Sequence, residues 1–398
     1  MTQKTIDQIQ GCLFGGAAGD ALGYPVEFMR EKEIFYNYGK RGITEYEIDR
    51  KSKKAIISDD TQMTLFTASG LLFGETEMRM GRTEDSLRTY VESAYQDWLL
   101  TQEMSFDQYQ KEASLSSNRV SWLMDVPELF FRRAPGNTCL DALRNLRRRE
   151  QKVQDYIRNP QNNRKGCGGI MRVAPAGLFK TASIEKLDYE GAQLAAITHG
   201  HPLGYMPGAV LAHIVNRIVF PDPADEKLHG KRSLKEIILE ARDTMERIFG
   251  GDPYLKKLTE VIDKAVDLAE NQEEDLINIH RLGEGWVAEE TLGISLYCSL
   301  RYQKDFSAGI IAAVNHKGDS DSTGAVTGNI LDAWLGYSQI EDKWKHDLEL
   351  SDVILELAQD ISRRSGIDEY HLQEDPDWRR KYISCRWKSD FADSLHES

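Results

Sequence analysis

Two clusters of acidic and hydroxyl side chains lie far apart in this chain, at residues 58–61 and 319–323. Both interrupt apolar or glycine-rich sequence, so we expect both to be buried. Neighbouring carboxylates repel one another, and a buried carboxylate without a cationic partner is costly. A divalent cation such as Mg²⁺ or Mn²⁺ relieves both penalties, because hard oxygen atoms are its preferred ligands. The clusters therefore predict a shared metal site and a fold that joins the two ends of the chain.

Each cluster has a plainer interpretation when it is taken alone. Acidic doublets such as the one at residues 59–60 are common in loops, although the next basic residue along the chain is Arg79. Residues 318–330 resemble a tight turn followed by a helix of small residues, in which an Asp or Ser would cap the helix. The pairing of the two clusters is what favours metal binding.

The composition is that of a globular protein with an acidic surface. The chain has 398 residues, of which 40% are hydrophobic, and a formal net charge of −14. This charge argues against general nucleic-acid binding, which depends on lysine and arginine side chains that neutralise phosphates. Five scattered cysteines without CxxC or Cys/His metal spacing predict reduced thiols in the core.

The apolar stretch at residues 11–19 is too short to cross a bilayer and is ended by Asp20. No secretory leader is recognised at the start of the chain, so we expect a cytoplasmic protein with no membrane partner. The density of glycine and alanine in this stretch instead predicts a helix that packs very closely against its neighbours. Within it, Asp20 is expected to cap or bridge packed helices, because buried polar groups are usually hydrogen-bonded.

Helical periodicity predicts an all-α protein. Apolar residues recur at three- and four-residue spacing from Leu255 to Ala269, after a predicted start at Asp252-Pro253. Period-two runs typical of strands are scarce. Comparable patterns predict further helices at residues 183–197, 207–219, 233–249, 287–302 and 351–361.

The chain is interpreted as a single domain over residues 1–398. Its length would allow two domains, but the two acidic clusters must meet in one core if they share metal. Polar stretches near residues 79–133 and 224–284 are therefore expected to be surface elaborations of that core. The aromatic-rich C-terminal tail is expected to pack against the helices rather than to bind a ligand.

Five blocks of sequence carry a resemblance to a known family. In chain order they are residues 11–23 followed by Glu27, then residues 58–63, 168–175, 198–199 and 318–325. In their order and spacing these blocks resemble the ADP-ribosylglycohydrolase family, from Gln10 to about Ala333. The resemblance implies a compact all-α orthogonal helical bundle with a dinuclear metal cleft. It also implies two divalent cations, Mg²⁺ or Mn²⁺, as cofactors.

The resemblance implies six metal ligands by position. They are Ser58, Asp59, Asp60, Asp319, Asp321 and Ser322. Serine stands where the commoner family pattern has threonine, which keeps the donor oxygen but leaves the side chain less stiff at χ1. Lys317 stands where a small residue is expected, and a cation there would alter metal affinity or substrate preference.

The catalytic candidates are Glu27 and Asp60. Composition alone would make Glu27 an exposed side chain in a turn. The resemblance instead places it beside the metals, where Glu27 or Asp60 would handle a proton. Which carboxylate acts as acid and which as base stays open, because coupled carboxylates share their titration.

Two glycine-containing loops, at residues 135–138 and 166–169, precede helical sequence. Backbone N–H groups at helix N-termini can bind an anion, although either loop alone is more simply an ordinary turn. The resemblance makes both loops candidates to hold the pyrophosphate of ADP-ribose, and it makes a ligand-facing role plausible for His199. Arg172 would either assist or form an internal salt bridge. The candidate substrate-binding residues are Gly136, Asn137, Gly166, Gly168, Gly169 and His199.

The reaction implied is hydrolysis of the bond between the anomeric carbon of the distal ribose and an acceptor. The expected substrate is an ADP-ribosylated protein or small molecule, and the product is ADP-ribose. Arginine is the favoured acceptor, because the chain most resembles the family's bacterial archetype. Serine, a nucleobase and a small guanidine are the alternatives.

Two other classes of function compete with this enzyme. A noncatalytic ADP-ribose-binding or structural protein on the same fold is one, but decay of the ligand set would then be expected. A metal-dependent phosphohydrolase unrelated to the family is the other, but it would not explain the glycine-rich helix or the block at residues 171–175.

Overall fold

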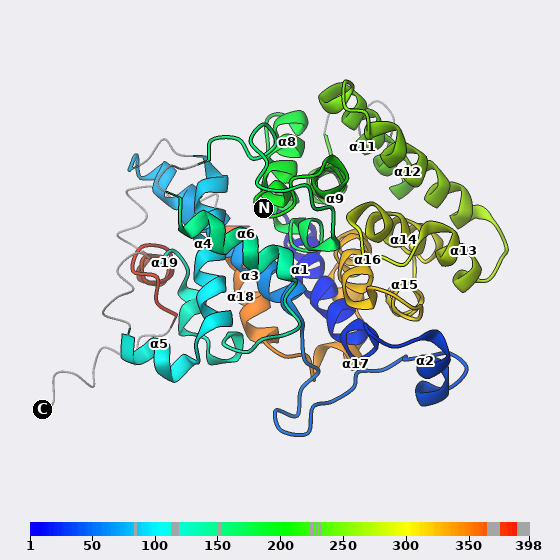
Figure 1. Cartoon of the computed structure of the whole chain (residues 1–398), viewed down its shortest axis with the longest axis horizontal. Coiled ribbons are helices and arrows are strands. Elements are labelled where there is room, and N and C mark those ends of the chain that lie inside the picture. The colour runs from blue at the N-terminus through cyan, green and yellow to red at the C-terminus, as the bar shows by residue number, and fades with distance from the viewer. Residues whose placement is uncertain are drawn as a thin grey trace, which may run out of the picture.

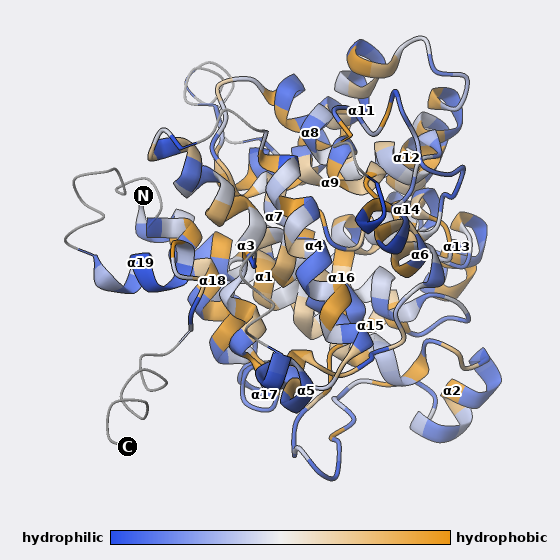
Figure 2. Ribbon diagram, turned by 60° about the vertical axis from the view of Figure 1, so that its left-hand side comes forward, coloured by the Kyte–Doolittle hydropathy of each residue, from blue (hydrophilic) through white to orange (hydrophobic). Residues whose placement is uncertain are grey.

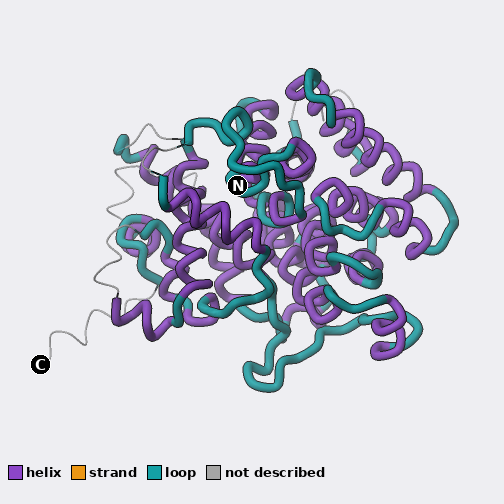
Figure 3. The backbone as a smooth tube through the Cα atoms, in the orientation of Figure 1, coloured by secondary structure: helices purple, strands orange, loops and turns teal. Residues whose placement is uncertain are grey.

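The computed structural model describes residues 1–82, 86–112, 119–149, 153–222, 227, 230, 232–363 and 375–387. Helices dominate these residues, and no strand occurs among them (Figure 3). Extended pairing in the same ranges is limited to isolated bridges, such as the one between Ile48 and Ala55. The predicted all-α class is confirmed.

The helices follow one another along the whole chain. The α-helices are α1 Gln3–Gly23, α2 Glu31–Tyr38, α3 Asp59–Arg79, α4 Leu87–Glu103, α5 Phe106–Glu112, α6 Asn137–Arg147, α7 Ala174–Gly177, α8 Ile184–Ala196, α9 Pro202–Val219, α11 Leu234–Phe249, α12 Leu255–Glu270, α13 Asp275–Leu282, α14 Ala288–Arg301, α15 Phe306–Val314, α16 Ser320–Leu335, α17 Asp342–Lys345, α18 Ser351–Arg363 and α19 Pro376–Tyr382. Short 3₁₀ turns are η1 Tyr24–Val26, η3 Trp122–Asp125, η4 Pro127–Leu129, η5 Cys167–Gly169 and η6 Tyr337–Gln339.

Helices α1 and α16 pack side by side at the centre of the molecule, so the first helix of the chain lies against residues 320–335 (Figure 1). A Cβ atom at Gly19 would lie only 2.0 Å from the carbonyl oxygen of Gly324. At Gly23 it would lie 2.3 Å from the carbonyl oxygen of Ser320. Only glycine allows backbones to approach this closely. The predicted close packing of the glycine-rich helix is confirmed, and it places the start of α16 beside the end of α1.

The other helices cover this central pair. In Figure 2 the central helices α1, α3 and α16 are mostly pale to orange, with some hydrophilic residues, whereas hydrophilic residues colour much of α2 and α19. In the polar stretch at residues 224–284, α11 packs on α9 and α12 packs on α14. Their amphipathic faces bury Ile238 and Ile262 among other residues. The division into one domain stays a prediction.

Two predicted helix starts are wrong. Helix α9 begins at Pro202, and Pro207 lies inside it. The reason is that His201 caps the helix, since its Nδ1 accepts from the Leu203 N–H at 3.0 Å. The second start, at residues 252–253, is two residues early, because Asp252 instead forms a turn in which its side chain accepts from the Tyr254 N–H at 2.8 Å.

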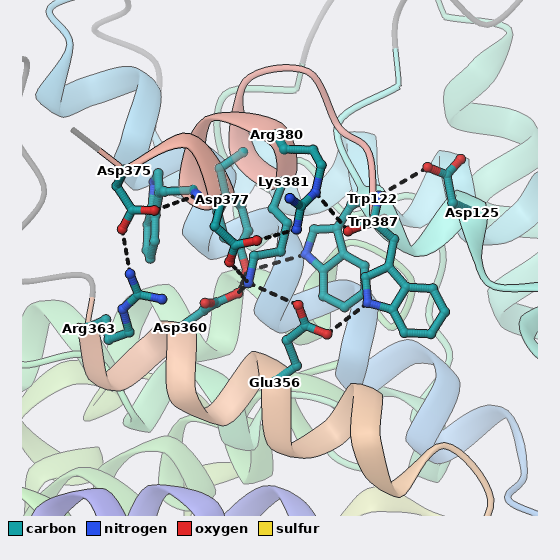
Figure 4. Close-up of polar contacts among 12 residues, drawn as sticks. Trp122, Asp125, Glu356, Asp360, Arg363, Asp375, Asp377, Arg380, Lys381 and Trp387 are labelled. Atoms are coloured by element: carbon teal, nitrogen blue, oxygen red, sulfur yellow. Dashed lines mark hydrogen bonds and ion pairs between the residues drawn. The ribbon is translucent and has the colours of Figure 1, made fainter. Parts of the chain in front are cut away.

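The C-terminal helix α19 is fastened to α18 and α3 through buried polar contacts (Figure 4). Lys381 is only 2% exposed, and its Nζ donates to Asp360 Oδ2 at 2.6 Å. The Tyr382 hydroxyl donates to the same oxygen at 2.7 Å. Trp378 is also buried, so the tail aromatics pack against the bundle as predicted. Tyr370, another tail aromatic, lies outside the described residues.

The apolar stretch at residues 11–19 is buried within α1. Within the part of the chain that the structure describes, none of the helices combines the length and apolarity needed to cross a membrane. All five cysteines are free, as their spacing predicts, and four of them are buried.

Candidate active site

Asp20 of α1 holds the start of α3. It is fully buried, and its carboxylate oxygens each accept from the Ser58 N–H at 3.0 Å. One of them also accepts from the Thr61 N–H at 3.1 Å and from the Thr61 hydroxyl. Burial raises the pKa of Asp20 to about 6, although these hydrogen bonds oppose the rise. The predicted bridging role of Asp20 is confirmed, and it orients Asp59 and Asp60 in the first turn of α3.

The second cluster begins α16. Gly318 has φ of +131°, and a Cβ atom there would lie 1.9 Å from the carbonyl oxygen of Glu284. That same oxygen accepts from the Asp319 N–H at 2.9 Å. Asp319 is the N-cap, as one interpretation of the sequence predicts, and it accepts from the Ser322 N–H at 3.3 Å. Asp319 therefore caps α16 and also belongs to the acidic cluster.

The two clusters meet where the start of α16 lies beside the end of α1. The Ser322 hydroxyl of α16 donates to Asp60 Oδ2 of α3 at 2.7 Å. Glu27, which follows η1, joins Asp319 and Asp321 in a buried group whose carboxylate oxygens lie within 4.8 Å of one another. Glu27 Oε2 is buried without a hydrogen-bond partner. The structure thus gathers Glu27 and both acidic clusters in one place.

This concentration of carboxylates disfavours their ionised forms. Burial, together with the charges of Asp319, Asp59 and Asp20, raises the pKa of Glu27 to about 9. Burial and neighbouring carboxylates also raise the pKa of Asp60 well above its usual value. A cation among these groups would restore the charged forms, because opposite charge favours ionisation.

The donor set fits a hard divalent cation. The candidate ligands offer oxygen atoms only, which suits Mg²⁺ and Mn²⁺ better than softer metals. Glu27 Oε2, a buried oxygen of this cluster without a hydrogen-bond partner, could accept such a cation. Coordination by each of the six predicted ligands, and the number of cations, stay predictions.

The first glycine loop lies against Asp59. The Gly136 N–H donates to Asp59 Oδ2 at 3.4 Å, and the Asp59 N–H donates to the carbonyl of Arg133 at 3.0 Å. A Cβ atom at Gly136 would meet nothing within 4 Å, so the space in front of this residue is open. Asn137 begins α6 and is exposed. The loop therefore borders the carboxylates and leaves room for a ligand.

The second glycine loop lies against Asp319. The thiol of Cys167, which is part of η5, donates to Asp319 Oδ2 at 2.7 Å. The sequence marks Cys167 only as one of five scattered thiols, and its position between Gly166 and Gly168 is the signal that could have placed it here. Gly168 and Gly169 of this loop are buried. Both candidate anion-binding loops thus reach the carboxylate cluster from different elements.

His199 lies behind the second loop. A Cβ atom at Gly168 would come within 2.9 Å of His199 Cε1. The His199 ring is 2% exposed, and its Nδ1 lies 2.8 Å from Thr198 Oγ1. Burial and the nearby Arg172 lower the pKa of His199 to about 3, so the ring is neutral. This position supports the loop, and direct contact between His199 and a ligand stays a prediction.

Arg172 is internal. It is fully buried, donates to Thr198 Oγ1 at 2.6 Å and lies over the ring of Tyr95 at 4.6 Å. These contacts are with a hydroxyl and an aromatic face, so Arg172 reinforces the packing behind the loop.

The comparison with known proteins agrees with this arrangement. A family model described as ADP-ribosylglycohydrolase matches residues 1–369. The chain belongs to the ADP-ribosylglycohydrolase family. Its class of activity is hydrolytic removal of ADP-ribose, and members of the family act on ADP-ribosylated substrates.

Individual relatives are distant. The chain is 25% identical to ADP-ribosyl-[dinitrogen reductase] glycohydrolase of Rhodospirillum rubrum, over 86% of this chain and 91% of that protein. It is 22% identical to ADP-ribosylarginine hydrolase Tri1 of Serratia proteamaculans, over 90% of this chain and 80% of that protein. Human ADP-ribosylhydrolase ARH3 is 27% identical, over 50% of this chain and 58% of ARH3.

A solved structure shows the same fold. It is titled ADP-ribosylglycohydrolase-related protein complex, and it superposes with a TM-score of 0.60 at 23% identity. The superposition covers 92% of this chain and all of that one. The all-α family fold is confirmed by this likeness, whereas a dinuclear cleft is not part of what the likeness shows.

Proposed function

We propose that this protein is a metal-dependent hydrolase that releases ADP-ribose from ADP-ribosylated arginine on protein, with two divalent cations, Mg²⁺ or Mn²⁺, as cofactors. One observation carries the proposal. Glu27, Asp319 and Asp321 are buried within reach of a single ion, beside Asp59 and Asp60, and one oxygen of Glu27 lacks any hydrogen-bond partner. In its ionised form such a group is unfavourable in a protein core unless it binds a cation.

Bound divalent cations would supply Lewis-acid chemistry and orient the vicinal hydroxyls of the ribose. In hydrolysis, water bonds to the anomeric carbon while the bond to the acceptor nitrogen breaks, and a proton must reach the leaving group. Glu27 or Asp60 is the group that takes or delivers that proton. Burial and neighbouring carboxylates raise the pKa of both groups, so either can hold a proton when no cation is bound.

The two glycine loops are proposed to hold the rest of the substrate. Their backbone N–H groups at residues 135–138 and 166–169 would bind the pyrophosphate, with Gly136, Asn137, Gly166, Gly168 and Gly169 as its neighbours. The contacts of Gly136 with Asp59 and of Cys167 with Asp319 support this, since they set both loops beside the carboxylates. His199 would contribute by holding the second loop in place or by contacting the ligand.

Arginine as the acceptor is supported by similarity. The Rhodospirillum rubrum relative and the Serratia relative both span most of this chain, and the latter is named for ADP-ribosylarginine. The ARH3 relatives match over about half of this chain. The similarity to the first two proteins therefore extends over more of this chain.

The test is release of free ADP-ribose from substrates linked through arginine, serine and a nucleobase, each with and without Mg²⁺ or Mn²⁺. We expect metal-dependent release, fastest from the arginine linkage. Variants Asp59→Ala and Asp319→Ala should lose both metal affinity and turnover. Faster release from serine would contradict the arginine assignment but not the reaction class.

Two further outcomes would identify the competing classes of function. Binding of ADP-ribose without hydrolysis of any linkage would indicate a noncatalytic binding protein on this fold. Release of inorganic phosphate from simple phosphoesters, without release of ADP-ribose, would indicate a phosphohydrolase.

A further inference from the structure

Two exposed aromatic side chains stack on each other beside the carboxylate cluster. Phe28 is 73% exposed and Trp286 is 39% exposed, although both are large and apolar. Their ring centroids lie 5.9 Å apart with the ring planes inclined by 23°. Contiguous apolar surface at a polar site is typical of a place where a ligand binds. We call Phe28 and Trp286 the aromatic pair.

The backbone on each side of the aromatic pair contacts the site. Phe28 directly follows Glu27 in the chain. On the other side, the carbonyl of Glu284 accepts from the Asp319 N–H at 2.9 Å, and the carbonyl of Trp286 accepts from the Cys167 N–H at 3.2 Å. The pair therefore joins the Glu27 side of the cluster to the Asp319 side. Residues 284–286 carry no motif that would mark them in the sequence.

The surface beside Trp286 is not basic. A depression of about 570 Å³ there is lined by His280, Gly283, Glu284, Trp286, Val287, Glu290 and Lys317. Its two basic side chains already contact carboxylates, because Lys317 Nζ lies 2.6 Å from Glu284 Oε1 and His280 Nε2 contacts Glu31. Glu290 adds a further carboxylate, which accepts from the Glu284 N–H at 3.0 Å. The charge balance favours a cationic ligand over a phosphate.

We propose that the aromatic pair binds the planar guanidinium of the acceptor arginine and so selects this linkage over others. This proposal rests on the proposed function. In ADP-ribosyl-arginine the guanidinium is bonded directly to the anomeric carbon, where Glu27 would act, and Phe28 is the next residue. A planar cation stacks on aromatic faces, and arginine does so more readily than a neutral hydroxyl acceptor.

The test replaces the aromatic faces with aliphatic side chains. In Trp286→Leu and Phe28→Leu, KM for ADP-ribosyl-arginine should rise roughly 2- to 30-fold, the range expected for loss of a cation–π contact. Turnover of ADP-ribosyl-serine and the affinity for ADP-ribose should stay within about twofold, since neither ligand carries a guanidinium. Trp286→Phe keeps an aromatic face and should recover most of the lost affinity. Tyr36→Leu, at an 88% exposed aromatic on α2, is the matched control.

Three results would overturn the proposal. Equal losses for arginine- and serine-linked substrates, or weaker binding of ADP-ribose itself, would show that the pair holds the shared ADP-ribose portion. Unchanged KM for the arginine linkage in both leucine variants would show that it holds nothing. A folding defect is recognised by a thermal melt, and the more exposed Phe28 position gives the safer variant.

A failure of the proposed function is distinguishable from a failure of this inference. If no linkage is hydrolysed, binding is measured by calorimetry in Glu27→Gln protein, with and without Trp286→Leu. If the aromatic pair binds the guanidinium, ADP-ribosyl-arginine should bind more tightly than ADP-ribose, and Trp286→Leu should reduce this preference. An unchanged preference would overturn the inference whatever the reaction.

Discussion

At the scale of single residues, Glu27 is the side chain whose chemistry and position are least compatible with a purely structural role. It is buried, its Oε2 has no hydrogen-bond partner, and its pKa is raised to about 9 by burial and by the charge of Asp319. We predict that Glu27→Gln keeps the shape of this side chain and the binding of ADP-ribose. Turnover should fall by roughly 10²–10⁴-fold, the range typical of general acid–base catalysis. Single-turnover release of ADP-ribose and calorimetry with ADP-ribose measure the two effects separately.

The matched comparison is Asp60→Asn. Asp60 is the other candidate for proton transfer, and it also accepts from the Ser322 hydroxyl, which links the two clusters. If Glu27→Gln turns over at a near-normal rate while Asp60→Asn does not, and calorimetry shows that Asp60→Asn still binds Mg²⁺, the proton-transfer role belongs to Asp60.

At the scale of elements, the two glycine loops differ in what a side chain would meet. At Gly136, where φ is −61°, an added methyl group meets no protein atom within 4 Å. At Gly168 it would lie 2.9 Å from Cys139 Sγ and from His199 Cε1. We predict that Gly136→Ala leaves stability unchanged and weakens ADP-ribose binding more than Mg²⁺ binding, because the methyl group enters the space in front of the loop. Calorimetry with each ligand, alongside thermal melts, tests this.

Asn137→Ala is the control for this loop, because removal of an exposed side chain should matter less than filling the space at the backbone. Gly168→Ala should also weaken ADP-ribose binding, and it should lower the melting temperature as well, since the loop must move to accommodate the methyl group. Equal loss of ADP-ribose and Mg²⁺ affinity in Gly136→Ala would mean that the glycine only supports the fold.

At the scale of the whole molecule, the buried carboxylates link stability to pH and to metal. Burial raises the folded-state pKa to about 6 at Asp20 and about 9 at Glu27, above the value of about 4 expected in the unfolded chain. Protonation of these two carboxyl groups therefore stabilises the folded state fully below about pH 4. This stabilisation is lost as pH rises through their folded-state pKa values. We predict that the melting temperature of the metal-free protein falls between about pH 5 and pH 9. Added Mg²⁺ should reduce that fall, because it stabilises the ionised carboxylates.

Differential scanning fluorimetry across this pH range, with Mg²⁺ or with a chelator, measures the effect. The difference between the melting temperatures with Mg²⁺ and with chelator, taken at each pH, reports on the carboxylate cluster. Other titrating groups, such as His213 with Asp188, affect both curves alike. Stabilisation by Mg²⁺ should grow with pH. A difference that stays constant across the range would count against binding at these carboxylates.

Much of the architecture was predictable because its determinants are local. Helices α8, α11, α12, α14 and α18 follow from apolar periodicity with capping residues such as Ser183 and Ser233, and these signals span only a few residues. The two wrong starts also have local causes. At α9 two prolines compete as the start and the capping side chain of His201 decides between them, and at α12 Asp252 forms a turn before the helix. The acidic clusters and glycine loops were likewise visible as motifs.

The meeting of the two acidic clusters was expected from their shared need for a cation, but the contacts that bring them together could not be worked out from spacing along the chain. Three contacts join segments that no local pattern connects. They are the hydrogen bond from the Ser58 N–H to Asp20, the contact of Cys167 with Asp319, and the stacking of Phe28 on Trp286. Glycines let α1 and α16 approach to backbone distance, and Asp20 near the end of α1 holds the start of α3, so the starts of α3 and α16 lie together. Local sequence sets which residues form a helix or a cap, whereas the packing of the whole chain sets which distant side chains share one buried, low-dielectric site.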